Sequence, residues 1–429
     1  MESFAEQGRP IGVDLFAGAG GLSLGFEQAG FDVAAAIEID PVHCATHEFN
    51  FPRTATICAS VTDLSAETIR SRSSIGQADI DVVFGGAPCQ GFSMMGKRAL
   101  DDPRNQLVGH FVRLIRELHP KYCVFENVKG LTLGKHIKFL DELIEALVNS
   151  GYRVVLPYQV LNAADFGVPQ DRRRLFLVAA RPDVHLPMYP TPLDKRTTVW
   201  DAIGDLPDAD SFDDLLDSDS VTTRWNTTST YASRMRSLVT DVSNFGYGRK
   251  FDGDCLTSSL RTVHSPLSRM RFAATPAGDT EPISRFHKLN PSGLCNTLRA
   301  GTDSARGAFT SPRPIHPVLQ RVITVREAAR LHSYPDWFRF HKTKWHGFRQ
   351  IGNSVPPLLA RAVAGEIMKA LGITPVKPNF LLQQGHPELL TYDMGAAARR
   401  FHVPHDVIAQ RTRKTGEKCL NLELAYAHT

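Results

Sequence analysis

One cysteine stands in a setting that suits a nucleophile. Cys89 lies in the stretch 84–93, which reads Phe-Gly-Gly-Ala-Pro-Cys-Gln-Gly-Phe-Ser. Pro88 fixes one backbone dihedral angle, and the flanking glycines let the chain turn sharply and approach a ligand. Taken alone, a cysteine is more often a small buried hydrophobic residue than a reactive one. The apolar run 82–84 predicts a buried strand that would present the thiol at the edge of a sheet.

A glycine-rich turn near the start of the chain has the features of a cofactor site. Gly18 and Gly20 fall where a predicted strand meets a predicted helix, so backbone N–H groups would face a ligand. Glu38 follows Gly20 by 18 residues and ends the next predicted strand, where a carboxylate can accept hydrogen bonds from ribose hydroxyls. The third glycine is misplaced for a dinucleotide site, and Asp14 would repel a pyrophosphate but could hold a cationic amino-acid group. The charge favours S-adenosylmethionine over NAD.

The elements that must position these residues follow an alternating pattern over residues 11–180. Short apolar runs alternate with segments that carry apolar residues at helical spacing, and this pattern indicates a doubly wound, Rossmann-like α/β sheet. Two further helices are predicted at 325–332 and 356–371. Strands are predicted at 11–16, 33–37, 82–84, 123–125 and 174–180, and helices at 21–29, 41–49, 110–118 and 139–148.

Composition and charge change after residue 186, where Pro, Ser, Thr, Asp and Arg dominate and a smaller, loop-rich domain is predicted. Residues 201–219 contain eight Asp and no Lys or Arg, whereas residues 221–350 contain 20 Lys plus Arg against 8 Asp plus Glu. The basic stretch indicates a polyanion partner, although an evenly charged solvated surface is the alternative. The Asp-rich stretch is predicted to be a surface linker that faces away from that partner.

Several classes of protein are disfavoured by the composition. The seven cysteines are scattered and form no C-x-x-C pair, which argues against a disulfide framework and a zinc site and favours a reducing cytoplasm. No apolar run approaches the ~20 residues of a membrane span. Residues 1–10 do not resemble a secretory signal. We therefore expect a cytoplasmic protein without a metal.

These motifs, together with others further along the chain, closely resemble the DNA (cytosine-5)-methyltransferases. The resemblance covers most of 11–180 and 315–372, with Ala87 where many members carry a second proline. It implies a methyltransferase fold whose methyl donor is S-adenosylmethionine and whose product is S-adenosylhomocysteine. It divides the chain into a catalytic domain at 1–185, a target-recognition domain at 186–344, a return to the catalytic domain at 345–375 and a C-terminal extension at 376–429.

The resemblance also implies roles for single residues. Cys89 would attack C6 of cytosine, because a thiolate is nucleophilic near neutral pH and leaves readily. Glu126 would hold a proton at the far side of the ring as an acid of raised pKa, although an ordinary ion-pairing carboxylate is the alternative. Arg174 would donate to the base carbonyl, and Arg172 would support a phosphate or a loop. In plain sequence, the run 172–174 is also compatible with a solvated basic patch.

Two further sets of residues are carried over from the family. The expected cofactor contacts are Asp14, Phe16, Gly18, Gly20, Glu38, Asp63, Leu64, Leu107, Asn353, Ser354 and Val355. The expected substrate contacts are Pro88, Gln90, Ser93, Asn127, Gln170, Thr297 and Leu298.

The expected partner is double-stranded DNA, from which the target cytosine must be flipped out to reach a thiol in a pocket. The segment 91–105 is predicted to act as a lid, and the basic region to track phosphates and read bases. The resemblance favours a sequence-specific enzyme that acts as a monomer and belongs to a restriction–modification or phage-defence system. An endonuclease or a defence protein is a possible partner. A tRNA-methylating relative and a catalytically silent DNA-binding protein are the alternatives.

Overall fold

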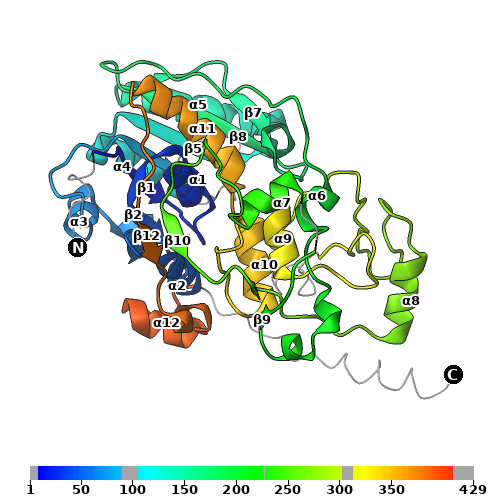
Figure 1. Ribbon diagram of the computed structural model, residues 1–429. Helices are drawn as coiled ribbons and strands as arrows, with labels where there is room; N and C mark the ends of the chain where they lie inside the picture. Colours follow the sequence, from blue (N-terminus) through cyan, green and yellow to red (C-terminus); the bar gives the residue numbers. More distant parts are fainter. Residues whose placement is uncertain (1–7, 89–104, 227–228, 302–312, 409–429) are drawn as a thin grey trace, which may run out of the picture.

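The computed structural model describes residues 8–88, 105–226, 229–301 and 313–408, and these form two adjoining lobes (Figure 1). The larger lobe is built on an eight-stranded sheet of order β3-β2-β1-β4-β5-β8-β6, with β7 paired beside β8. The strands are β1 (Ile11–Leu15), β2 (Asp32–Glu38), β3 (Ala55–Cys58), β4 (Val82–Gly85), β5 (Tyr122–Val128), β6 (Arg153–Val154), β7 (Gln159–Asn162) and β8 (Arg173–Ala180).

The sheet is mixed in direction. Strands β1 to β5 are parallel, as expected for strands joined by helical crossovers. Strand β8 runs antiparallel to β5, β6 and β7. No long helix separates β7 from β8, so the chain reverses direction there instead of crossing over the sheet. The doubly wound, Rossmann-like α/β fold is confirmed, with an antiparallel edge that the alternating pattern did not reveal.

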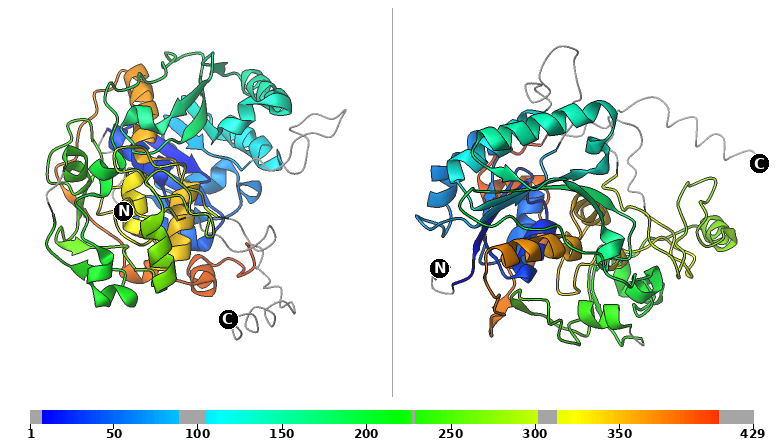
Figure 2. Two further views of the ribbon diagram at one scale, coloured as in Figure 1. Left: turned by 90° about the vertical axis from the view of Figure 1, so that its right-hand side faces the viewer. Right: turned by 90° about the horizontal axis from the view of Figure 1, so that it is seen from above.

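Helices cover both faces of this sheet because successive side chains in each strand point to opposite sides. In β5, Cys123 and Phe125 pack into the cluster with α3, α4 and α5, whereas Tyr122 and Val124 pack into the cluster with α1 and α11. Figure 2 shows α5 and α11 on opposite sides of the sheet. The helices are α1 (Gly21–Ala29), α2 (Pro41–Asn50), α3 (Ala66–Ser71), α4 (Gln106–Leu118), α5 (Ile137–Asn149) and α11 (Pro357–Ala370).

The smaller lobe has its own apolar core, formed mainly by helices from two distant parts of the chain. Helix α8 lies at its outer end (Figure 1). The short strands β9 (Val221–Thr222) and β11 (Cys255–Leu256) pair antiparallel beside this core. The helices are α6 (Val199–Ile203), α7 (Thr230–Met235), α8 (Pro266–Ala274), α9 (Val325–Leu331) and α10 (Lys344–Asn353). Helix α9 was predicted, whereas α10 was not.

The prediction that the Asp-rich stretch is a surface linker is wrong. Its apolar residues Leu206 and Leu215 are buried in the core of the smaller lobe. Five of its eight aspartates pair with arginines of the basic stretch, and in the Asp205–Arg330 pair this lowers the cost of burying both charges. The pairs are Asp205–Arg330, Asp208–Arg321, Asp210–Arg269, Asp213–Arg261 and Asp219–Arg339.

The C-terminal segment up to residue 408 returns to the larger lobe. Strand β12 (Leu381–Gln383) pairs parallel with β10 (Gly248–Lys250). The next residues, including α12 (Met394–Phe401), pack on α2, and Leu389 and Leu390 are buried against Phe49. The segment therefore covers the outer side of α2. Across the described ranges, every helix is too short or too polar to cross a bilayer.

Candidate active site

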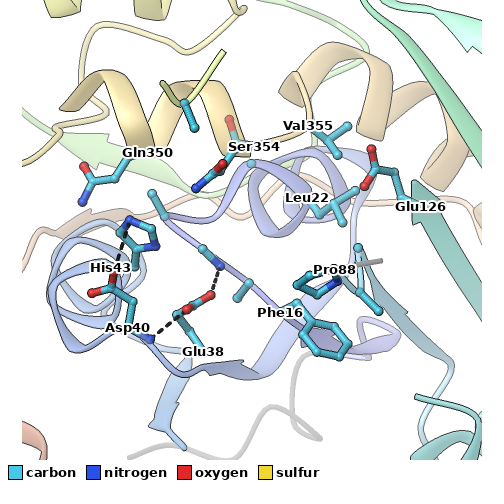
Figure 3. A pocket seen from close by; sticks show the side chains of 18 of the residues that line it. Phe16, Leu22, Glu38, Asp40, His43, Pro88, Glu126, Gln350, Ser354 and Val355 are labelled. Atoms are coloured by element: carbon cyan, nitrogen blue, oxygen red, sulfur yellow. Dashed lines mark hydrogen bonds and ion pairs between the residues drawn. The ribbon is translucent and has the colours of Figure 1, made fainter. Parts of the chain in front are cut away.

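A cavity of about 630 Å³ opens at the carboxyl ends of the parallel strands β1 to β5, the edge where sheets of this type bind ligands. In Figure 3, Glu126 lies beyond Pro88 on one side, and Glu38, Asp40 and His43 lie on the other. Of the residues expected to bind a cofactor or substrate, the cavity is lined by Phe16, Gly18, Glu38, Pro88, Leu107, Asn127, Thr297, Leu298, Asn353, Ser354 and Val355.

The turn between β1 and α1 is fixed by a carboxylate from β2. One oxygen of Glu38 accepts a hydrogen bond from the N–H of Gly18 at 2.8 Å, and the other accepts from the N–H of Asp40 at 2.8 Å (Figure 3). Gly20 has a φ of 102°, and a Cβ there would lie 2.3 Å from the Phe51 ring, so only glycine fits. The backbone turn and Glu38 together form one wall of the cavity.

Asp14 does not reach the cavity, which corrects its expected role as a partner of a cationic group. Side chains alternate along β1, so Asp14 points toward α1, where the hydroxyl of Ser23 donates to it at 2.6 Å. Asp14 is fully buried, and burial raises its pKa to about 8. A carboxyl that is neutral at pH 7 and sealed from the cavity cannot serve as a counter-ion there. Gly20 likewise shapes the turn without lining the cavity.

Two of the expected cofactor contacts, Asp63 and Leu64, do not reach the cavity, and the residues three positions earlier line it instead. Ser60 and Val61 line the cavity, whereas Asp63 and Leu64 do not. Leu64 is 5% exposed and packs into the apolar core, and Asp63 points to solvent at the end of the short 3-10 helix Val61–Asp63. The chain turns away from the cavity through that helix, so the residues before it form the wall.

Glu126 and Arg174 form an ion pair at the cavity. Val128 pairs with Arg174 in the antiparallel register of β5 and β8, so Glu126 and Arg174 are diagonal neighbours on one face of the sheet. Their side chains meet with 3.1 Å between Nε and Oε1. Burial raises the pKa of Glu126, and the charges of Arg174 and Arg172 oppose that rise. Burial lowers the pKa of Arg174. The pair can therefore hold a proton or donate hydrogen bonds to a ligand.

Asn127 ties this strand to the loop that carries the expected nucleophile. Its side-chain N–H donates to the carbonyl of Ala87 at 2.9 Å. Pro88 is the last described residue before the gap, and Cys89, Gln90 and Ser93 lie outside the described residues, as does most of the segment predicted to be a lid.

Gln170 is buried away from the cavity, which corrects the expectation that it contacts the substrate. Its exposed fraction is 0%, and its amide is bonded to the backbone of Leu298 and Leu331 and to the ring of His332. Arg172 is 1% exposed and donates to three backbone carbonyls. These contacts favour the second of the two roles predicted for Arg172, the support of a loop.

Comparison with known proteins decides the family. A family model for C-5 cytosine-specific DNA methylases matches residues 12–369. The chain belongs to this family. The predicted membership in the DNA (cytosine-5)-methyltransferases is confirmed, and with it the enzyme class.

Relatives of the methylase match it over most of their lengths. It is 64% identical to the type II methyltransferase M.XorII of Xanthomonas oryzae pv. oryzae over 405 residues, which are 94% of this chain and 95% of that protein. It is 36% identical to M1.HphI of Haemophilus parahaemolyticus, with 83% and 86% covered. A prophage-encoded E. coli protein described as a DNA modification methyltransferase matches with a TM-score of 0.70 and 34% identity, over 85% of this chain and 100% of that one.

Some cavity residues of the methylase were not found from the sequence. Asp40 caps α2 and His43 stands in its first turn, whereas Arg299 and Ile408 come from segments far along the chain. The sequence does mark Asp40 as the N-cap of α2, because an aspartate directly before a proline is typical of a helix start. In the structure, its side chain accepts a hydrogen bond from the N–H of Val42. No local signal marks Arg299 or Ile408, because only tertiary packing brings them to the cavity. No cluster able to hold a metal occurs among the described residues.

Proposed function

We propose that this methylase transfers a methyl group from S-adenosylmethionine to C5 of a cytosine flipped out of a specific duplex sequence. The observation that carries the proposal is the Glu126–Arg174 pair, which shares one cavity with the Glu38 turn. An acid-and-cation pair suited to a pyrimidine and a carboxylate suited to ribose hydroxyls thus face the same space. The 64% identity to M.XorII supports a type II restriction–modification role.

The cavity residues fit S-adenosylmethionine. Glu38 keeps lone pairs for ribose hydroxyls beyond the two backbone donors that it already binds. Phe16, Val61 and Leu107 offer apolar surface for an adenine ring, and Asn353 and Ser354 offer polar groups near the opposite wall. Since Asp14 is buried, the donor's ammonium would be held by backbone carbonyls or by Asp40. When bound, the cofactor supplies an electrophilic methyl group.

The chain's own residues activate the base. The Cys89 thiolate forms a bond to C6, and the electron pair displaced into the ring makes C5 nucleophilic while Glu126 holds a proton at the N3 and N4 edge. Arg174 orients Glu126 and donates to the base carbonyl. After C5 gains a methyl group, its proton leaves to solvent and the C6–S bond breaks, which restores the aromatic ring and the thiolate.

The domain division completes the proposal. Residues 1–185 with 345–375 form the catalytic domain, and residues 186–344 contact the duplex and read its sequence. A monomer is sufficient for this chemistry, because one chain supplies both walls of the cavity. A cognate endonuclease is the expected partner, and cytoplasmic DNA the expected substrate.

Methyl incorporation tests the function. Purified full-length enzyme with radiolabelled S-adenosylmethionine is expected to label duplex DNA and to leave tRNA unlabelled. Bisulfite sequencing of DNA from cells that express the gene should identify the modified cytosine and its sequence context. A duplex carrying 5-fluorocytosine at that site should form an adduct with Cys89 that survives denaturation. Label in tRNA alone, or no adduct with the wild type, would contradict the proposal.

A further inference from the structure

Three segments that are far apart in the sequence meet at the Arg172 guanidinium. Arg172 precedes β8 in the larger lobe. One terminal nitrogen donates to the carbonyl of Leu298 at 2.8 Å, and the other donates to the carbonyls of Gly352 and Ser354 at 2.9 and 2.8 Å. Leu298 belongs to the segment 297–300, which we call the recognition segment. Gly352 and Ser354 belong to 352–355, which we call the cofactor loop.

The charge of Arg172 makes this junction hard to open partway. The side chain is 1% exposed, and among the described residues no carboxylate lies within ion-pairing distance of it. A buried cation without hydrogen-bond partners is strongly disfavoured, so the three carbonyls compensate for the lost hydration. If either segment moved away, the guanidinium, which is almost fully buried, would lose hydrogen-bond acceptors. The two segments are therefore held together as one unit.

Gln170 and His332 form a second connection between the same parts. The N–H of Leu298 donates to the Gln170 carbonyl oxygen at 3.1 Å, and the Gln170 amide lies 3.0 Å from Nδ1 of His332. Nε2 of His332 lies 3.1 Å from the carbonyl of Ser354. Burial lowers the pKa of His332 well below its usual value, so a neutral ring accepts at Nδ1 and donates at Nε2. The backbone of Leu298 is thus held at both its N–H and its carbonyl.

Gly352 brings the two backbones into direct contact. A Cβ at this position would lie 2.3 Å from the backbone nitrogen of Ala300 and 2.3 Å from the carbonyl carbon of Arg299. Neither atom can move aside as a flexible side chain would, so any larger residue forces the recognition segment away from the cofactor loop.

Both connected parts line the same cavity. Thr297 to Ala300 form part of one wall, and Asn353, Ser354 and Val355 form another. We propose that the Arg172 junction couples the cofactor loop to the recognition segment, so that S-adenosylmethionine and the DNA target each strengthen the binding of the other. Arg172 is a positioning residue in this account, and the inference rests on the proposed function because it requires both ligands.

A thermodynamic cycle with the full-length enzyme measures this coupling. Calorimetry gives the Kd of S-adenosylhomocysteine for the free enzyme and for the enzyme saturated with a duplex that carries the methylated sequence. The ratio of the two values is the coupling factor, and titration of the duplex without and with S-adenosylhomocysteine must give the same ratio. In the wild-type enzyme, we expect the duplex to lower the Kd of S-adenosylhomocysteine about 10-fold, within the usual range of such couplings. In Arg172→Lys and Gly352→Ala the factor should fall to between about 1 and 2.

The matched control is Arg174→Lys, the same substitution two residues later in the chain, within β8. It replaces the guanidinium that contacts Glu126 and should slow methyl transfer while keeping the wild-type coupling factor. If Arg172→Lys does not fold by circular dichroism, Gly352→Ala decides the matter. A wild-type factor of 1, or a full factor in the folded junction variants, would overturn the coupling and leave the proposed function intact. Failure of the wild type to bind either ligand would instead count against the function itself.

Discussion

Two buried carboxyl groups near the cavity serve different purposes because their neighbours differ. Glu126 meets Arg174 at 3.1 Å and faces the cavity. Asp14 accepts hydrogen bonds from Ser23 and is sealed between β1 and α1. A cation beside a buried carboxyl favours its ionised form, whereas the hydrogen bonds from Ser23 lower the pKa of Asp14 by less than burial raises it. Glu126 is therefore suited to proton exchange with a ligand, and Asp14 to a structural role in the neutral form.

Replacing the acid at residue 126 tests this assignment. Glu126→Gln keeps the size of the side chain but cannot carry the proton, so kcat should fall by about 10²- to 10⁴-fold. The Kd of S-adenosylhomocysteine should stay within about 2-fold of the wild type, because Glu38 and the glycine turn are untouched. Single-turnover methylation and calorimetry measure the two quantities. A large loss of cofactor affinity with unchanged kcat would reverse the assigned roles.

The neutral Asp14 makes stability depend on pH. Its pKa rises from 3.8 in the unfolded chain to about 8 in the fold, so the folded state binds the extra proton. Its contribution to stability is fully present below pH 3.8 and is lost as the pH rises through about 8.

The matched variant for this test is Asp14→Asn, which cannot ionise. Melting temperatures of both proteins should be recorded from roughly pH 5 to pH 9. The wild type should lose stability relative to the variant as the pH rises across that window. Parallel curves for the two proteins would show that Asp14 is ionised in the fold.

At the scale of elements, helix α2 is held between the sheet and the C-terminal segment. Its N-cap Asp40 and His43 in its first turn line the cavity, and its outer side packs on Leu390. The N–H of Lys342 donates to the carbonyl of Leu390 at 2.8 Å, which fastens the segment to the smaller lobe as well. The C-terminal segment thus supports a helix that forms part of the cavity wall.

Truncating one apolar contact measures that support. Leu390 is 3% exposed, so Leu390→Ala should lower the free energy of unfolding by about 2–5 kcal/mol. Leu381 in β12 of the same segment is 67% exposed, so Leu381→Ala should change the free energy of unfolding by less than about 0.5 kcal/mol. Chemical denaturation compares the two. Equal effects would mean that the segment does not brace α2.

At the scale of the whole molecule, much of the basic charge is used within the protein. Arg321 is buried and paired with Asp208 and Glu327, and Arg330 is buried and paired with Asp205 and Asp336. Two aspartates of the acidic stretch therefore pair with buried arginines of the basic stretch inside the smaller lobe. The charge available to a duplex resides in exposed cations such as Arg299, which lines the cavity.

Two arginine variants separate these uses of charge. Arg321→Met removes the cation beside the buried Glu327 carboxylate and should destabilise the fold by about 3–5 kcal/mol. Arg299→Ala should leave stability nearly unchanged but weaken duplex binding. If the Arg299 side chain contacts a phosphate, the slope of the logarithm of the duplex binding constant against the logarithm of salt concentration should become shallower by about 1. Denaturation and salt titrations of duplex binding provide both readouts. A shallow wild-type slope would contradict a basic DNA-binding face.

Local pattern in the sequence was sufficient for the doubly wound fold class of the larger lobe and for the cofactor turn, but not for the antiparallel edge of the sheet. Apolar alternation and helix caps depend on near neighbours, and the predicted strand at 123–125 and helix at 21–29 appear as β5 and α1. The order of β1, Gly18, β2 and Glu38 along the chain also places them at one edge of a parallel sheet. The family membership follows from the same short motifs, each of which can be read without knowing what it contacts.

Contacts between distant residues were decided only by tertiary structure. Whether Asp14 faces the cavity depends on how β1 packs against α1. The hydrogen-bond partners of Arg172 lie 126 to 182 residues away in the sequence. The pairing of the Asp-rich stretch with Arg321 and Arg330 likewise reverses what local charge density predicts. A residue's type sets which interactions it can make, but burial and charge compensation depend on the whole fold, and these determine which interaction it does make.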